Sequence, residues 1–311
     1  MTVLIGTCSW TDRVTEQAQH LYHTARPTAE QKLRCYATLF PTVEVDSTFY
    51  ALPAPQTCQQ WAQRTPDGFV FHVKAFSLFT THRTQTQTLP AEVRQMLPQH
   101  LQTKDQLTPQ EVPEPVKDKL WRLYRETLEP LQMAGKLGCV LLQFAPWFKP
   151  TAEAAEYIRY CREQLAGFDV AVEFRHKEWF EGRLRERTLK LLRDNNLTNV
   201  SLDMPQGFDT SILPIIEATT NQSYVRLHGR NTDTWERSGM PVNNIHDYWY
   251  TESELQEWLD WVRQLEKQTD QVYVLFNTVQ GLHTALEFQE MAVPDSNRGD
   301  FPANNGTHRL F

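Results

Sequence analysis

The sequence of 311 residues is poor in glycine and lacks long apolar runs, and each shortage excludes a class of protein. Its 12 glycines follow no G-x-y period, which excludes a collagen-like fibre. No stretch reaches the roughly 18 apolar residues that a membrane-spanning helix needs. The longest candidate, Leu137 to Phe148, is interrupted by Gln143 and Pro146. We therefore predict a globular protein that does not enter the membrane.

The cysteines and the N-terminus indicate a cytoplasmic location. The five cysteines are odd in number and form no C-x-x-C motif, a pattern that favours free thiols in a reducing compartment and disfavours a thiolate zinc site. The N-terminal segment MTVLIGTCSW has no cationic residue ahead of its short apolar run. It is therefore interpreted as a first strand rather than a signal peptide.

The charge balance is acidic, with 31 Lys and Arg against 38 Asp and Glu and a net charge of −7. Such a surface repels nucleic acid and anionic membranes, so neither is favoured as a partner, although a local basic pocket is compatible with it. Hydrophobic residues make up 40% of the chain, which supplies a core and excludes global disorder. The composition does not indicate an oligomeric state.

Short apolar runs alternate with helical patterns along almost the whole chain. The eight predicted strands are Val3–Ser9, Thr42–Asp46, Phe69–Ala75, Cys139–Phe144, Val170–Arg175, Asn199–Asp203, Tyr224–His228 and Val272–Asn277. The predicted helices are Thr28–Phe40, Pro55–Arg64, Val116–Leu137, Ala152–Leu165, Leu184–Asn195 and Ser253–Gln268. Eight parallel βαβ units close into a barrel, so we predict an α/β fold, a (β/α)8 TIM-type barrel.

The barrel is expected to form a single domain over residues 1–293, followed by a tail at 294–311. An insertion of about residues 77–119 follows the third strand and is either partly helical, as Ala91–Leu101 indicates, or a mobile cover. The alternative fold is a doubly wound open sheet. No G-x-G-x-x-G turn follows any strand, which disfavours its dinucleotide-binding version.

Ionisable residues alternate with apolar ones in five of the predicted strands. Because the outer strand face of a barrel packs on helices, the ionisable face is expected to point inward, toward the C-terminal mouth where catalytic residues of this fold lie. This places at the mouth Asp46, Lys74, Gln143, Arg175, Asp203, His228 and Asn277. One layer deeper it places Glu44, His72, Glu173 and Arg226. His82, just beyond the third strand, is within reach of the same opening.

These residue types are typical of acid/base chemistry on a small anionic substrate, phosphorylated or carboxylated and sugar-like. Glu173 and Asp203 are the predicted acid and base, because neighbouring buried carboxylates have pKa values that are pushed apart. The predicted anion and substrate ligands are Lys74, Arg175, Arg226, His228, Gln143 and Asn277, with Glu44, Asp46, His72 and His82 organising them. The chemistry is compatible with a hydrolase, a lyase or an isomerase.

Three alternatives stay open. The first is a noncatalytic phosphate- or nucleic-acid-binding module whose aromatic loops stack bases. The second is a divalent-metal phosphodiesterase or isomerase with Glu173, Asp203 and His228 as ligands; otherwise no cofactor is predicted. The third is an internal ion-pair network that serves only the fold.

Several segments together resemble the YecE-like family, also called domain of unknown function 72. They run in order over about residues 3–290: GTCSW at 6–10, VEVDSTFY at 43–50, FHVK at 71–74, TH at 81–82, LQFAP at 142–146, VEFRH at 172–176, RLHGR at 226–230 and YWY at 248–250. The resemblance implies a TIM barrel and leaves the reaction open. Asp46 and Thr278 stand where that family usually has asparagine, so both departures fall at the predicted mouth.

Overall fold

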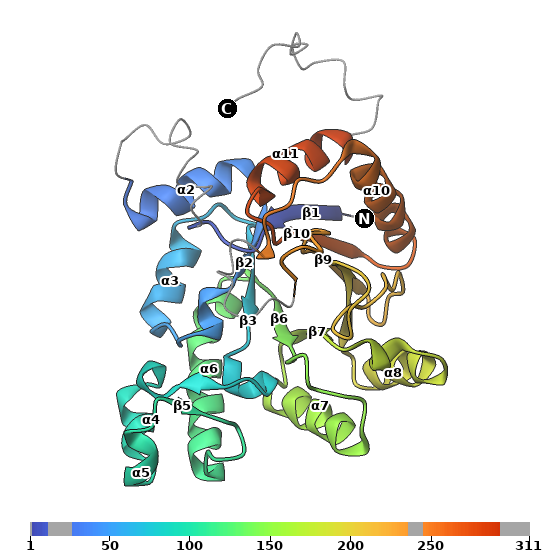
Figure 1. The fold of residues 1–311 in the computed structure, drawn as a ribbon. Coiled ribbons are helices and arrows are strands. Elements are labelled where there is room, and N and C mark those ends of the chain that lie inside the picture. The colour runs from blue at the N-terminus through green and yellow to red at the C-terminus, as the bar shows by residue number, and fades with distance from the viewer. Residues whose placement is uncertain (1, 12–26, 236–244, 293–311) are drawn as a thin grey trace.

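The computed structural model describes residues 2–11, 27–235 and 245–292, and the predicted tail at 294–311 lies outside them. Eight parallel strands form a closed barrel (Figure 1). In order around the barrel they are β1 (Thr2–Thr7), β2 (Thr42–Val45), β3 (Val70–Lys74), β6 (Leu137–Gln143), β7 (Asp169–Glu173), β8 (Thr198–Asp203), β9 (Gln222–Leu227) and β10 (Gln271–Phe276). The predicted (β/α)8 TIM-type barrel is confirmed.

Helices surround the barrel on its outside (Figure 1). They are α2 (Ala29–Leu39), α3 (Pro55–Gln63), α6 (Glu114–Met133), α7 (Ala152–Gln164), α8 (Arg183–Asp194), α10 (Glu252–Glu266) and α11 (Gly281–Ala292). Helix α2 begins at a capping box formed by Thr28 and Gln31, and α10 at one formed by Thr251 and Glu254. The sequence patterns above do not indicate α11. Among the described residues, no helix is both long and apolar enough to cross a membrane.

Residues 204–221, between β8 and β9, contain no helix. This irregular segment covers β8 with backbone groups, so the outer face of β8 is polar: Asn199 Nδ2 and Ser201 Oγ both donate to the carbonyl of Ile215, at 3.3 and 2.7 Å. Leu202 of β8 is the register partner of Arg226 of β9. Register partners point to the same side of a sheet, so Leu202 faces into the barrel as Arg226 does. Asp203 lies on the same strand face as Ser201, so the prediction that Asp203 points into the barrel is wrong.

The insertion after β3 is ordered and partly helical. It contains two 3₁₀ turns, η3 (Ser77–Thr80) and η4 (Thr86–Thr88), the short helices α4 (Ala91–Gln95) and α5 (Gln99–Gln102), and a two-stranded ribbon, β4 (Thr84–Gln85) with β5 (Gln106–Leu107). Buried apolar residues such as Val93, Leu101 and Leu107 hold it together. It extends the lower end of the molecule in Figure 1, beside α6.

Glycine permits close packing where β1 meets β2. A Cβ atom on Gly6 would lie 2.1 Å from the carbonyl oxygen of Thr42, which is its register partner on β2. Since no side chain fits at that distance, Gly6 is needed for these two strands to pair and close the barrel.

Candidate functional site

A buried arginine lies at the centre of the polar barrel interior. Arg226, on β9, is fully buried, and its Nη1 donates to Glu173 of β7 and to Gln143 Oε1 of β6 at 3.0 Å. Its Nη2 donates to Glu44 Oε1 of β2 at 2.6 Å. Burial alone would lower the pKa of this guanidinium, but the two carboxylates outweigh it and hold the pKa well above its ordinary value. Arg226 therefore carries a permanent charge that links β9 to β2, β6 and β7.

Glu173 is an ionised carboxylate between two arginines. Its Oε2 accepts from Arg226, and its Oε1 lies 2.7 Å from Arg175 Nε, an ion pair without hydrogen-bond alignment. Burial would raise the pKa of Glu173, but Arg226 and Arg175 outweigh it and bring the pKa well below the ordinary value. A carboxylate this weakly basic is a poor proton carrier at neutral pH, so the geometry supports Glu173 as the anchor of the two arginines.

Glu44 and Asp46 form a second acidic group in the barrel, and unlike Glu173 this pair can exchange a proton near neutral pH. They lie two residues apart in and just after β2, so both point into the barrel. Burial first and the negative charge of Asp46 second raise the pKa of Glu44 to about 7, against the opposing effect of Arg226. For Asp46 burial is outweighed by Lys74 and Arg226, and its pKa is lowered. The pair therefore holds one exchangeable proton near neutral pH.

The pair spans two depths of the barrel. Glu44 is fully buried, and its Oε2 accepts from the hydroxyl of Tyr224 at 2.7 Å. Asp46 retains 29% of its side-chain exposure and lies at the mouth, where Lys74 Nζ is 3.3 Å from its Oδ1. Tyr224 lies two residues before Arg226, so strand alternation places both side chains on the same inward face. The sequence did not predict a role for Tyr224.

Two cations line the rim, each beside an aromatic ring. Lys74 Nζ lies 4.6 Å from the ring centre of Phe49, and the guanidinium of Arg175 lies 5.4 Å from that of Trp235. Both side chains keep 11% exposure. The Nη1 atom of Arg175 is buried and has no hydrogen-bond partner among the residues that the structure describes.

Neutral imidazoles and amides complete the mouth. Asn277 Nδ2 lies 2.9 Å from His228 Nδ1, and the other ring nitrogen, Nε2, lies 3.3 Å from Arg226 Nη1 and 3.5 Å from Glu173 Oε1. Burial and Arg175 bring the pKa of His228 well below its ordinary value. His82, held by Thr80 Oγ1 at 2.9 Å, lies against Phe49, and burial lowers its pKa to about 4. These histidines are therefore uncharged at neutral pH.

His72 lies deeper, among aromatic rings. Its ring centre is 4.8 Å from that of Tyr224 and 4.3 Å from that of Tyr273, and its Nδ1 accepts from the backbone N–H of Cys139 at 3.0 Å. Burial lowers its pKa to about 3. The neutral ring is fully buried and packs in the barrel interior against Tyr224 and Tyr273.

Asp203 does not join this cluster, which corrects the prediction. Its carboxylate accepts from the hydroxyl of Tyr250 at 2.6 Å and from Arg230 Nε at 2.9 Å, on the side of α10. Burial raises its pKa against these two partners. Arg230 and Tyr250 lie beyond β9, where no strand alternation signals their direction.

The other predicted residues converge on the mouth and the layer beneath it. These are Glu44, Asp46, Lys74, Gln143, Glu173, Arg175, Arg226, His228 and Asn277. The three weak metal candidates do not converge, because Asp203 faces away. Within residues 2–11, 27–235 and 245–292, no group of three His, Cys, Asp or Glu side chains is arranged to hold a metal ion.

Comparisons with known proteins give one consistent result. A family model described as "Protein of unknown function DUF72" matches residues 4–305. The UPF0759 protein YunF of Bacillus subtilis is 29% identical over 293 residues, which are 93% of each chain.

Solved structures agree with the fold. A DUF72 family protein of Thermotoga maritima superposes with a TM-score of 0.69 at 27% identity, over 94% of this chain and 99% of its own. A DUF72 family protein of Enterococcus faecalis has a TM-score of 0.74 at 22% identity, over 94% and 95% of the two chains.

Proposed function

Because the chain belongs to the DUF72 family, whose description leaves the reaction open, we propose from the geometry of the mouth that this barrel binds a small anion-bearing substrate and transfers a proton on it. Arg175 and Lys74 hold the anionic group. The Glu44–Asp46 pair supplies and accepts the proton. The substrate class is a phosphorylated or carboxylated sugar-like molecule, and the reaction is an isomerisation, an elimination or a hydrolysis.

The observation that carries the proposal is the buried Nη1 of Arg175, which lacks a hydrogen-bond partner among the described residues. A buried donor left unsatisfied costs about 1–3 kcal/mol, and more when the group is charged. An anionic oxygen at the mouth would accept this N–H and remove that cost. Arginine suits the task because its planar fork matches a carboxylate or a phosphate.

The charge balance of the cluster also favours an anion. Its cations are Lys74, Arg175 and Arg226, and its carboxylates are Glu44, Asp46 and Glu173. When Glu44 is protonated, three cations face two carboxylates and the cluster carries one positive charge. When Glu44 loses its proton near pH 7, the cluster becomes neutral. Anion binding is therefore expected to weaken as the pH rises through 7.

The proton step uses the pair in order of depth. Asp46, at the mouth, passes a proton from the substrate to the buried Glu44, which holds it until Asp46 returns it to another substrate atom. A pKa of about 7 suits this work, since general acid/base catalysis is most efficient when the pKa lies near the working pH. In this arrangement Glu173 orients the arginines and stays ionised.

Calorimetric titration with sulfate and with succinate tests the proposal. The parent is expected to bind at least one of them, and Arg175→Gln is expected to lose about tenfold or more in affinity, consistent with the loss of a charge-assisted hydrogen bond. The matched control is Arg159→Gln, a half-exposed arginine of α7 paired with Glu156, which should bind as the parent does. Equal affinities of the parent and Arg175→Gln would refute the anion site.

The pH dependence tests the proton pair separately. Sulfate keeps its charge between pH 5 and 9, so any change in its affinity over that range comes from the protein. We expect weaker binding above pH 7 in the parent and a flat profile in Glu44→Gln. A parent profile that stays flat through pH 7 would contradict the assignment of the exchangeable proton to this pair.

A further inference from the structure

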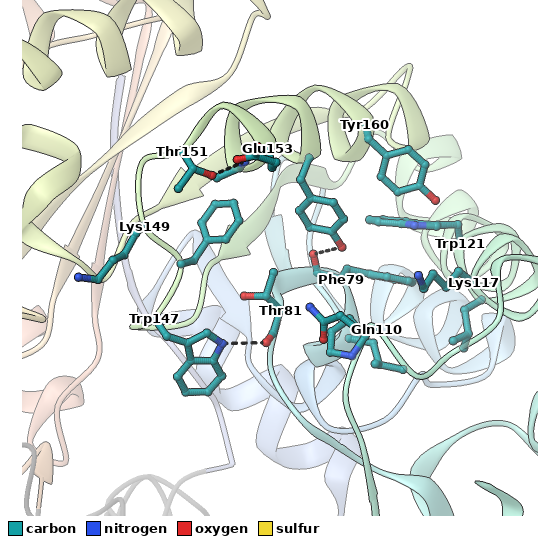
Figure 2. Close-up of a pocket in the computed structure, with 16 residues that line it drawn as sticks. Phe79, Thr81, Gln110, Lys117, Trp121, Trp147, Lys149, Thr151, Glu153 and Tyr160 are labelled. Atoms are coloured by element: carbon teal, nitrogen blue, oxygen red, sulfur yellow. Dashed lines mark hydrogen bonds between the residues drawn. The ribbon is translucent and has the colours of Figure 1, made fainter.

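A cavity of about 530 Å³ lies outside the barrel, between the insertion and helices α6 and α7 (Figure 2). This lateral pocket is defined by Phe79 of η3, Thr81, Trp121 of α6, Trp147 and Phe148 after β6, and Tyr157 and Tyr160 of α7. Its volume falls in the range of about 300–1,000 Å³ that is typical of small-molecule sites.

The walls of the lateral pocket are aromatic and flat. Phe79 and Trp121 stack with ring centres 3.5 Å apart and an angle of 8° between their planes, and both are buried. At the other end Trp147 is 60% exposed, with its Nε1 donating to the carbonyl of Thr81 at 3.2 Å. Figure 2 shows Trp147 and Thr81 at one end and Trp121 and Tyr160 at the other. A planar ring would stack between such walls.

Two hydroxyls of the lateral pocket are buried and unsatisfied. Thr81 Oγ1 and Tyr160 Oη both lack a hydrogen-bond partner in the part of the chain that the structure describes. Trp121 lies near Tyr160, close enough to influence its pKa, but no aligned hydrogen bond joins the two side chains. Since a buried hydroxyl costs free energy unless it is paired, these two groups point to a ligand with polar atoms on its edge.

The backbone of Thr81 gives an independent indication. Its φ of 66° lies in the left-handed region, which a β-branched residue rarely adopts and glycine adopts freely. Strained residues of this kind cluster at functional sites. The strain places a hydroxyl at the pocket where glycine would place nothing.

The charges around the lateral pocket nearly cancel. Lys117 Nζ pairs with Glu114 at 2.6 Å, Lys149 Nζ pairs with Glu178 at 2.9 Å, and Glu153 also lines the cavity. This balance favours an uncharged ligand, in contrast to the cationic rim of the barrel.

We propose that the lateral pocket binds the uncharged planar heteroaromatic ring of a small molecule, of the size of a nucleoside, stacked on its aromatic walls with Thr81 and Tyr160 hydrogen-bonded to the ring edge. The site adjoins the barrel mouth, where His82 lies 5.7 Å from Trp147 between ring centres, but none of the charged residues of the mouth lines it. The proposal does not depend on the acid/base function.

Calorimetry and thermal unfolding with adenosine, guanosine and ribose test this site. At least one nucleoside should bind and raise the melting temperature, and ribose should do neither. Thr81→Val and Tyr160→Phe, which remove only the hydroxyls, should each reduce the affinity by about three- to tenfold, the usual effect of one hydrogen bond. Thr81→Ser keeps the hydroxyl and should bind like the parent.

The unliganded variants separate binding from folding. Thr81→Val should melt at or above the temperature of the parent, because it removes a buried unpaired hydroxyl. Arg175→Gln, altered at the mouth, should bind the nucleoside with unchanged affinity. The proposal is overturned if neither nucleoside binds, if ribose binds as well, or if both hydroxyl variants bind with the affinity of the parent.

Discussion

Replacing Arg226 by methionine should strongly destabilise the protein, because it leaves buried carboxylates without their shared partner. Arg226 and both of its acidic partners, Glu44 and Glu173, are fully buried. Glu44 already has a pKa of about 7 and takes up a proton easily, so the penalty falls mainly on the ionised Glu173. Removing one partner of a buried ion pair costs about 3–5 kcal/mol. For a chain of this size that loss corresponds to a fall in melting temperature of roughly 5–8 °C.

Urea unfolding followed by circular dichroism measures this effect. In the parent, the lowered pKa of Glu173 gives stability that is present above its unfolded pKa and lost as the pH falls. The difference between the parent and Arg226→Met should therefore be fully present at pH 7 and shrink as the pH falls below about 4.5, the ordinary pKa of a glutamate. The double variant Glu173→Gln/Arg226→Met should recover most of the loss. A loss below about 1 kcal/mol, or a double variant no more stable than the single one, would refute the reasoning.

Three further predictions concern single positions. Glu44→Gln should gain up to roughly 3 kcal/mol of stability relative to the parent as the pH rises from about 4.5 to 7, because the raised pKa of Glu44 gives stability that is lost on deprotonation. Urea unfolding across this pH range measures the difference in stability, and a constant difference would contradict the prediction. Asp203→Asn should lower the free energy of unfolding by about 1–3 kcal/mol and leave the sulfate affinity unchanged, because Asp203 binds Arg230 and Tyr250 away from the mouth. A loss of sulfate binding in this variant would show that Asp203 belongs to the anion site. Gly6→Ala should cost at least about 1–3 kcal/mol in urea unfolding, because its Cβ would lie 2.1 Å from the Thr42 carbonyl oxygen, and a neutral result would mean that β1 and β2 can separate without loss.

The barrel could be predicted from the sequence because each strand is recognisable from its amino-acid composition and from its short apolar run. The observed strands start and end within two residues of those predicted, and their parallel closure follows from the intervening helices. Most of the polar cluster could also be predicted, since alternation assigns Glu44 and Asp46, or Arg226 and His228, to one face of a strand.

The same rule failed on β8 for a specific reason. It assumes that the outer face of every strand packs on an apolar helix, whereas β8 is covered by the irregular residues 204–221. Asn199 and Ser201 therefore face outward to bond the carbonyl of Ile215, and Asp203 follows them. Where no helix covers a strand, the polar residues of that strand can face outward instead of into the barrel.

The roles of the carboxylates could not be predicted from the sequence. Glu173 and Glu44 are equally buried, but Glu173 contacts two arginines, whereas Glu44 shares Arg226 and faces Asp46. These contacts join different strands, so their distances depend on register and not on spacing along the chain. The lateral pocket was hidden for the same reason, because its walls come from segments as far apart as Phe79 and Tyr160.

An anomalous difference map from crystals soaked in tungstate, a heavy analogue of phosphate and sulfate, tests the anion site most directly. We predict a tungsten peak at the barrel mouth, with an oxygen within hydrogen-bond distance of Arg175 Nη1 and Lys74 Nζ. Peaks confined to other surfaces, with the mouth empty in crystals of a protein that binds sulfate in solution, would contradict the assignment of this cluster as the binding site.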